Sequence, residues 1–152
     1  MKKISIIGAG TMGNGIAQVF AMNNYQVNLI DLNSNSLTNA INRITTNLDR
    51  MIKRDVISSD QKTATLDNIS ISTDINSAKS SDLVIEAVTE DIKVKLKIFA
   101  QLDQICSSET ILATNTSSIS ITEIAASTKR EDKVIGMHFM NPVPIMKLVE
   151  VI

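Results

Sequence analysis

The sequence predicts an α/β fold, in which a mostly parallel sheet is covered by helices on both faces. Segments with the β-branched, apolar composition of buried strands alternate with segments whose apolar residues recur at helical spacing. A glycine-rich loop, Gly8-Ala-Gly-Thr-Met-Gly13, joins the first strand to the first helix, and Asp31 closes the second strand. Strand, loop, helix, strand and acid together occupy about 30 residues, the length of one βαβ unit.

The first half of the chain is predicted to hold three strands and three helices. Apolar spacing indicates a helix over residues 12–23 and a long amphipathic helix over 36–54. A shorter helix over 59–66, begun by Ser58 or Ser59, would complete a helical hairpin with the long one. The strands predicted here cover residues 4–7, 25–30 and 69–72.

The second half repeats the alternation. Helices are expected over residues 91–105 and from Ser120 to about Ser127, where Ser120-Ile-Thr-Glu123 has the form of a capping box. The predicted strands cover residues 83–88, 110–114 and 133–139, and another begins within 147–152. The whole predicts a doubly wound sheet of the Rossmann type with a helical hairpin inserted after the second strand, in one domain over residues 1–152.

Composition disfavours several classes of function. A net charge of -1 and 3% aromatic residues are unlike a nucleic-acid-binding surface. One cysteine and one histidine leave almost no basis for a zinc site, so we expect no metal. No apolar run approaches the roughly 18 residues of a membrane span, and the start of the chain is too short for a signal peptide. We therefore expect a cytoplasmic protein that binds neither nucleic acid nor membrane.

The glycine loop predicts a dinucleotide site. Gly8 permits the tight turn, Gly10 lets the backbone approach a pyrophosphate, and Gly13 lets the helix pack closely on the strand. The free N–H groups of the helix start, where Thr11 and Met12 lie, would hold the phosphate oxygens.

Asp31 selects the cofactor. Its carboxylate can accept hydrogen bonds from the adenine ribose hydroxyls and would repel a 2′-phosphate, and no arginine follows it. The sequence therefore favours NAD over NADP. A glycine turn beside an unrelated surface acid remains the alternative.

His138, the one histidine, is the candidate proton acceptor. It lies near the carboxyl end of a predicted strand, where open α/β sheets bind ligands, and the loop after it contains Asn141. Glu150 lies twelve residues later on an apolar strand and would be stabilised by pairing with His138, fixing its tautomer. A structural histidine and an exposed acid on an edge strand are the alternatives.

Polar residues follow two further strands at the same predicted edge. Asn115-Thr-Ser-Ser118 could hold a substrate oxygen or the nicotinamide ribose, or could simply form a turn that caps a helix. Glu90 and Lys95 follow the strand over 83–88, and by themselves they indicate an exposed helix start.

The longer motifs resemble the amino-terminal domain of the 3-hydroxyacyl-CoA dehydrogenases, and among these the bacterial 3-hydroxybutyryl-CoA dehydrogenases. The blocks that carry this resemblance are Gly8-Ala-Gly-Thr-Met-Gly-Asn-Gly-Ile-Ala17, Ile85-Glu-Ala-Val-Thr-Glu90, Asn115-Thr-Ser-Ser-Ile119, His138-Phe-Met-Asn-Pro-Val-Pro144 and Lys147-Leu-Val-Glu-Val151. The histidine and asparagine blocks are far more specific than the glycine loop.

The resemblance implies oxidation of (S)-3-hydroxyacyl-CoA to 3-oxoacyl-CoA with NAD, or the reverse, in fatty acid or butanoate metabolism. It makes His138 the general base, Glu150 its partner and Ser117 the residue that hydrogen-bonds the C3 oxygen. It places Lys53 and Arg54, on the helical hairpin, near the CoA phosphates, although a solvated basic turn explains them equally well. The cofactor contacts that it implies come from Asp31, Glu90, Lys95, Asn115 and Asn141.

Members of the family that this chain resembles have a second, helical domain, which we expect to be absent from this chain. That domain supplies dimer contacts, so longer members are expected to be homodimers, and it closes the acyl pocket. Val149-Glu-Val-Ile152 is an apolar end with no polar tail, so we expect a domain cut from, or encoded apart from, a longer protein. Such a domain should bind NAD but turn over poorly.

Two other interpretations of the function of this sequence remain open. A non-catalytic NAD-binding or structural protein could share the fold, although it would not need the pair of His138 and Glu150. A dehydrogenase of the hydroxyisobutyrate type resembles this chain in its glycine loop, but that family lacks the block that begins at His138.

Overall fold

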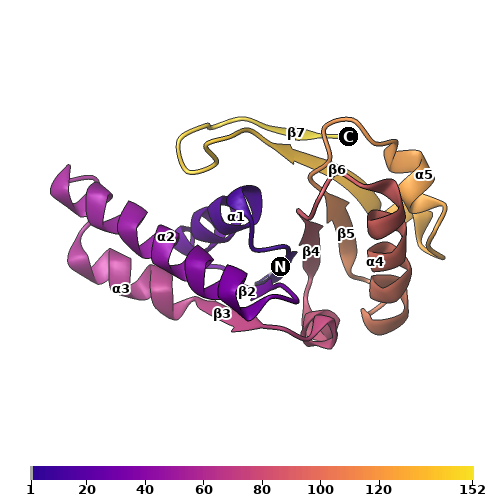
Figure 1. Cartoon of the computed structure of the whole chain (residues 1–152), viewed down its shortest axis with the longest axis horizontal. Coiled ribbons are helices and arrows are strands. Elements are labelled where there is room, and N and C mark those ends of the chain that lie inside the picture. Colours follow the sequence, from indigo (N-terminus) through magenta and orange to yellow (C-terminus); the bar gives the residue numbers. More distant parts are fainter. Residues whose placement is uncertain (1) are drawn as a thin grey trace.

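The computed structural model describes residues 2–152 and has the predicted α/β architecture (Figure 1). One seven-stranded sheet has the order β3-β2-β1-β4-β5-β6-β7. Neighbouring strands are parallel from β3 to β6, and β7 is antiparallel to β6. The strands are β1 Lys3–Ile7, β2 Gln26–Ile30, β3 Ile69–Ser72, β4 Leu83–Glu86, β5 Ile111–Thr114, β6 Val134–Phe139 and β7 Val149–Val151.

Helices cover both faces of the sheet, so the doubly wound Rossmann-type prediction is confirmed. The α-helices are α1 Thr11–Met22, α2 Ser34–Lys53, α3 Ser59–Asp67, α4 Ile92–Ile105 and α5 Ile121–Ala125. In Figure 1, α1, α2 and α3 lie on one side of the sheet and α4 and α5 on the other. The pair α2 and α3 is the predicted helical hairpin, and Ser58 begins α3 with a complete capping box.

The core divides into two apolar layers because side chains alternate between the faces of each strand. Ile4 and Ile6 of β1 pack in one layer with residues of α1 and α2, whereas Ile7 packs in the other with Phe99 and Leu102 of α4. The carboxyl ends of the parallel strands lie at a single edge of the sheet, and the loops at this edge carry the polar side chains.

The observed elements differ from the prediction in their ends. The strand predicted over 83–88 stops at Glu86, because the backbone N–H of Val88 bonds to the Glu86 side chain. Ser120 caps α5 by accepting from the N–H of Glu123, but the return bond of a capping box is absent and the helix ends at Ala125. Two short 3-10 helices, Ile75–Ser80 and Glu131–Lys133, were not predicted. Among residues 2–152, no helix has both the length and the apolar character needed to cross a bilayer.

Candidate functional site

The glycine loop turns tightly at the carboxyl end of β1. Gly8 has a φ of +105°, which side-chain-bearing residues rarely adopt, and its N–H bonds to the carbonyl of Ile30 at 2.7 Å. A Cβ on Gly13 would lie 1.7 Å from the carbonyl oxygen of Gly8, so only glycine lets α1 approach the strand this closely. Around Gly10, by contrast, no atom lies within 4 Å of an added Cβ. The backbone is thus open on the side where a pyrophosphate would meet the start of α1.

Asp31 connects the end of β2 to this loop. One carboxylate oxygen accepts from the N–H of Ala9 at 2.8 Å, and the other accepts from the N–H of Asn33 at 2.9 Å. Each oxygen retains a further lone pair for a hydroxyl donor. Leu32, next to it, is 91% exposed. The open backbone, the helix start and the carboxylate together fit a bound dinucleotide.

His138 and Glu150 face each other across β6 and β7. They are paired residues in the antiparallel register, and Nδ1 of His138 lies 2.9 Å from a carboxylate oxygen of Glu150. With Nδ1 donating to that oxygen, the lone pair of Nε2 is left to accept a proton. The side chain of His138 is 24% exposed and that of Glu150 is 50% exposed, so Glu150 lies on an exposed edge strand and is paired as well.

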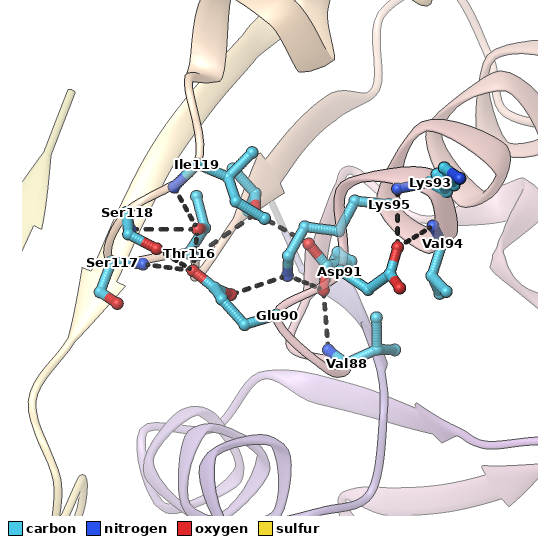
Figure 2. A network of polar contacts seen from close by, with 12 residues as sticks. Val88, Glu90, Asp91, Lys93, Val94, Lys95, Thr116, Ser117, Ser118 and Ile119 are labelled. Carbon is cyan, nitrogen blue, oxygen red and sulfur yellow. Dashed lines mark hydrogen bonds and ion pairs between the residues drawn. The ribbon is translucent and has the colours of Figure 1, made fainter.

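The Asn115–Ser118 loop is fixed to its surroundings by two side chains. Oδ1 of Asn115 accepts from the N–H of Phe139 at 2.9 Å, which joins this loop to the residue beside His138. Oε1 of Glu90 accepts from the Thr116 hydroxyl, from the Ser118 hydroxyl at 3.1 Å and from the Ser117 N–H at 3.2 Å (Figure 2).

These contacts determine the protonation of Glu90. Burial alone would raise the pKa of its carboxyl group, but the Thr116 hydroxyl, the positive charge of Lys95 and the bonds from Ser118 and Ser117 outweigh it and lower the pKa. Glu90 is therefore a fixed anion at neutral pH. It anchors the loop to the start of α4.

Lys95 differs most from its expectation. As part of an exposed helix start it should reach solvent, but its side chain is only 1% exposed. Its Nζ lies 2.7 Å from Oε1 of Glu86 and 3.4 Å from Oε2 of Glu90. Glu86, fully buried, was not singled out from the sequence, although a carboxylate inside the apolar run 83–88 is the signal that a buried charge pair requires.

One pocket gathers most of the predicted site. It has a volume of about 330 Å³ and lies where the carboxyl ends of the strands meet. Its lining residues are Met12, Ala87, Val88, Glu90, Asn115, Ser117, His138, Phe139, Met140 and Asn141. Lys95 does not line it. The chain from residue 2 onward contains no cluster of three or more His, Cys, Asp or Glu side chains that would hold a metal ion.

A second pocket, of about 610 Å³, shares the lining residue Asn141 with the first. Between α1, α2 and the Asn141–Pro144 segment, it is lined by two cations that the sequence analysis missed, Arg43 and Arg50. Their seven-residue spacing, which places both on one face of α2, was the available signal. Lys53 and Arg54 are exposed at the end of α2 and line neither pocket.

Comparison with known proteins gives consistent results. The family model for the NAD-binding domain of 3-hydroxyacyl-CoA dehydrogenase matches residues 3–152. The chain is 47% identical to a 3-hydroxybutyryl-CoA dehydrogenase of Clostridioides difficile, covering 99% of this chain and 53% of that protein. It is 45% identical to the 3-hydroxyadipyl-CoA dehydrogenase of Escherichia coli, covering all of this chain and 32% of that protein.

Solved structures agree. The crystal structure of an (S)-3-hydroxybutyryl-CoA dehydrogenase from Ralstonia eutropha superimposes with a TM-score of 0.97 at 44% identity, over 99% of this chain and 53% of that one. A lactate dehydrogenase from Eimeria maxima, 16% identical with a TM-score of 0.64 over 91% of this chain and 44% of that one, shares the fold alone. The chain thus spans about half the length, or less, of these relatives.

Proposed function

The chain belongs to the 3-hydroxyacyl-CoA dehydrogenase family, as an NAD-binding domain, and we propose that it serves the interconversion of (S)-3-hydroxyacyl-CoA and 3-oxoacyl-CoA. The observation that carries the proposal is the His138–Glu150 pair, because His138 opens on the same pocket as Asn115 and Ser117. Two of the relatives are named for 3-hydroxybutyryl-CoA and 3-hydroxyadipyl-CoA. We expect 3-hydroxybutyryl-CoA as the substrate of this chain.

His138 acts as the base in the direction of oxidation. Its Nε2 takes the proton of the C3 hydroxyl, and the electron pair left on that oxygen forms the carbonyl bond as the C3–H bond breaks. When bound, NAD accepts the hydride that leaves C3. Glu150 stabilises the imidazolium through Nδ1, and the Ser117 hydroxyl donates a hydrogen bond to the C3 oxygen. In the reverse direction His138 returns the proton.

The open backbone of the glycine loop supports the cofactor-binding part of the proposal. The N–H groups near Gly10, Thr11 and Met12 would hold the pyrophosphate at the start of α1. Asp31 would accept from the adenine ribose hydroxyls and exclude a 2′-phosphate. Asn115, Glu90 and Asn141 line the pocket at the other end, where the nicotinamide and its ribose would lie.

We assign the second pocket to the CoA end of the substrate. Arg43 and Arg50 offer two exposed cations to phosphate groups, and the pocket borders the reacting site at Asn141, which lines both pockets. The basic pair predicted from the sequence, Lys53 and Arg54, lies outside it at the helix end.

Two double variants test the substrate assignment. Arg43→Met with Arg50→Met should weaken the binding of 3-oxobutyryl-CoA to the NADH-loaded chain by roughly tenfold or more, measured by calorimetry, with NADH affinity unchanged. Lys53→Met with Arg54→Met removes the same two charges and should have little effect. If the loss followed the second pair, the helix end would be the phosphate site. If neither pair mattered, the CoA assignment would be wrong.

The relatives' greater length bears on activity. The resemblance assigns a helical, dimer-forming domain to the rest of such proteins, and we propose that these 152 residues, a cytoplasmic NAD-binding domain, bind NAD without efficient turnover. Taken alone, these residues supply one side of the substrate site, so we expect them to orient the substrate poorly, and orientation contributes about 7–11 kcal/mol in well-ordered systems. A reduction rate for 3-oxobutyryl-CoA equal to that of a full-length relative would contradict this.

A further inference from the structure

Glu86 is a fully buried carboxylate that the proposed chemistry does not use. It is the last residue of β4, and its side chain accepts hydrogen bonds from α4, from the loop after β4 and from the end of β5. Oε1 accepts from Nζ of Lys95 and from the N–H of Val88, both at 2.7 Å. Oε2 accepts from the hydroxyl of Thr114, at the end of β5, also at 2.7 Å.

We propose that Glu86 is a positioning residue, which acts through Lys95 and Glu90 to hold the Asn115–Ser118 loop in its binding geometry. The proposal rests on the proposed function only in taking that loop to border the nicotinamide and the substrate. The ammonium group of Lys95 lies between the carboxylates of Glu86 and Glu90, and Lys95 does not line the pocket. Figure 2 shows Lys95 pointing toward Glu90.

Charge balance explains why Glu86 is needed. A buried ammonium group requires an anion close by, because a lone charge in the core is strongly destabilising. Glu86 supplies that anion at 2.7 Å, so Glu90 contacts Lys95 only at 3.4 Å and through Oε2. The Oε1 atom of Glu90 can therefore accept hydrogen bonds from the donors on Thr116, Ser117 and Ser118. Without the charge of Glu86, Lys95 would draw Glu90 inward and away from the loop.

The link then continues to His138. Thr114, which donates to Glu86, accepts from the N–H of Thr116, and Asn115 between them holds the N–H of Phe139 beside His138. The loop is therefore tied to Glu86 on one side and to β6 on the other. A shift of Glu90 should change the placement of Ser117 and Asn115 together.

The test uses the 152-residue chain and two readouts, the amide proton shift of Ser117 by NMR and the dissociation constant of NADH. Glu86→Gln keeps the size and the acceptor oxygen of the side chain but removes the charge. We expect it to move the Ser117 shift and to weaken NADH binding by roughly tenfold. Adding Lys95→Met should return the Ser117 shift to its wild-type value, because Glu90 then has only the loop as partner.

Asp103→Asn is the matched control, since Asp103 and Arg130 form another largely buried ion pair at the far end of α4. It should lower stability without moving either readout. Unchanged readouts in folded Glu86→Gln, or a double variant that does not restore the Ser117 shift, would overturn the proposal. If Glu86→Gln alone does not fold, the Ser117 shift of the double variant decides: a wild-type value supports the proposal, and an altered value overturns it. Failure of the wild-type chain to bind NADH would instead count against the proposed function, because the Ser117 shift is read without ligand.

Discussion

At the scale of single residues, Asp31 stabilises the glycine loop and is proposed to select the cofactor. Its carboxylate holds two backbone N–H groups, those of Ala9 and Asn33, and is proposed to face the adenine ribose. A charge in this position would repel a 2′-phosphate, so on this proposal discrimination between NAD and NADP would depend on the same atoms that stabilise the loop.

Asp31→Asn should therefore affect the two cofactors differently. The amide keeps one acceptor and loses the negative charge, so NADH affinity should fall by roughly tenfold while NADPH affinity falls less or rises. Fluorescence titration with each cofactor measures both constants. An equal loss for NADH and NADPH would mean that Asp31 acts on the loop alone.

Single residues also show which features of the site could be predicted from the sequence and which could not. Gly8, Gly13 and Asp31 were predictable because backbone geometry demands those residue types at that spacing. The burial of Lys95 was not, because the spacing of charges along a helix does not reveal that Glu86 of a neighbouring strand lies beneath it. Such pairings depend on tertiary packing.

At the scale of elements, α4 is held at its carboxyl end by Arg130. Its guanidinium group bonds to a carboxylate oxygen of Asp103 at 2.7 Å and to backbone carbonyls of Asp103 and Cys106. Burial alone would raise the pKa of Asp103, but the hydrogen bond from Arg130, the backbone N–H of Lys129 and their charges outweigh it and lower the pKa.

Asp103→Asn should reduce the free energy of unfolding by about 2 kcal/mol at neutral pH. Because the pKa of Asp103 is lower in the folded state, its stabilisation is present above the ordinary value of 3.8 and is lost as the pH falls through the folded-state pKa. The wild type and the variant should thus converge in acid, which urea unfolding at several pH values would measure. A difference that stayed constant down to the lowest pH would contradict an ionic origin.

The positions of the helices and strands were the features best predicted from the sequence. Helical spacing and β-branched runs located each strand and α-helix, because both patterns follow from burial of one face or of a whole strand. Ends were less predictable, as at Glu86, where a side chain replaces the ladder. The 3-10 helix Ile75–Ser80 has no periodic apolar signal from which it could be inferred.

At the scale of the whole molecule, the sheet topology brings distant residues to one pocket. His138 comes from β6, Asn115 from the loop after β5, Glu90 from the loop before α4 and Met12 from the first turn of α1, and they meet because the parallel strands end at the same edge. The second pocket, with Arg43 and Arg50, adjoins it through Asn141. On the proposed function, the C3 carbon of a CoA thioester would lie beside His138 and its phosphates beside Arg43 and Arg50.

The central claim is that His138 transfers the proton while the glycine loop and Asp31 hold the cofactor. Single-turnover reduction of 3-oxobutyryl-CoA, with the chain in excess over NADH and compared with His138→Gln, tests it most directly. The account predicts slow oxidation of NADH by the wild type, a loss of about 100-fold or more in the variant, and equal NADH dissociation constants. Equal rates in the two proteins would contradict it.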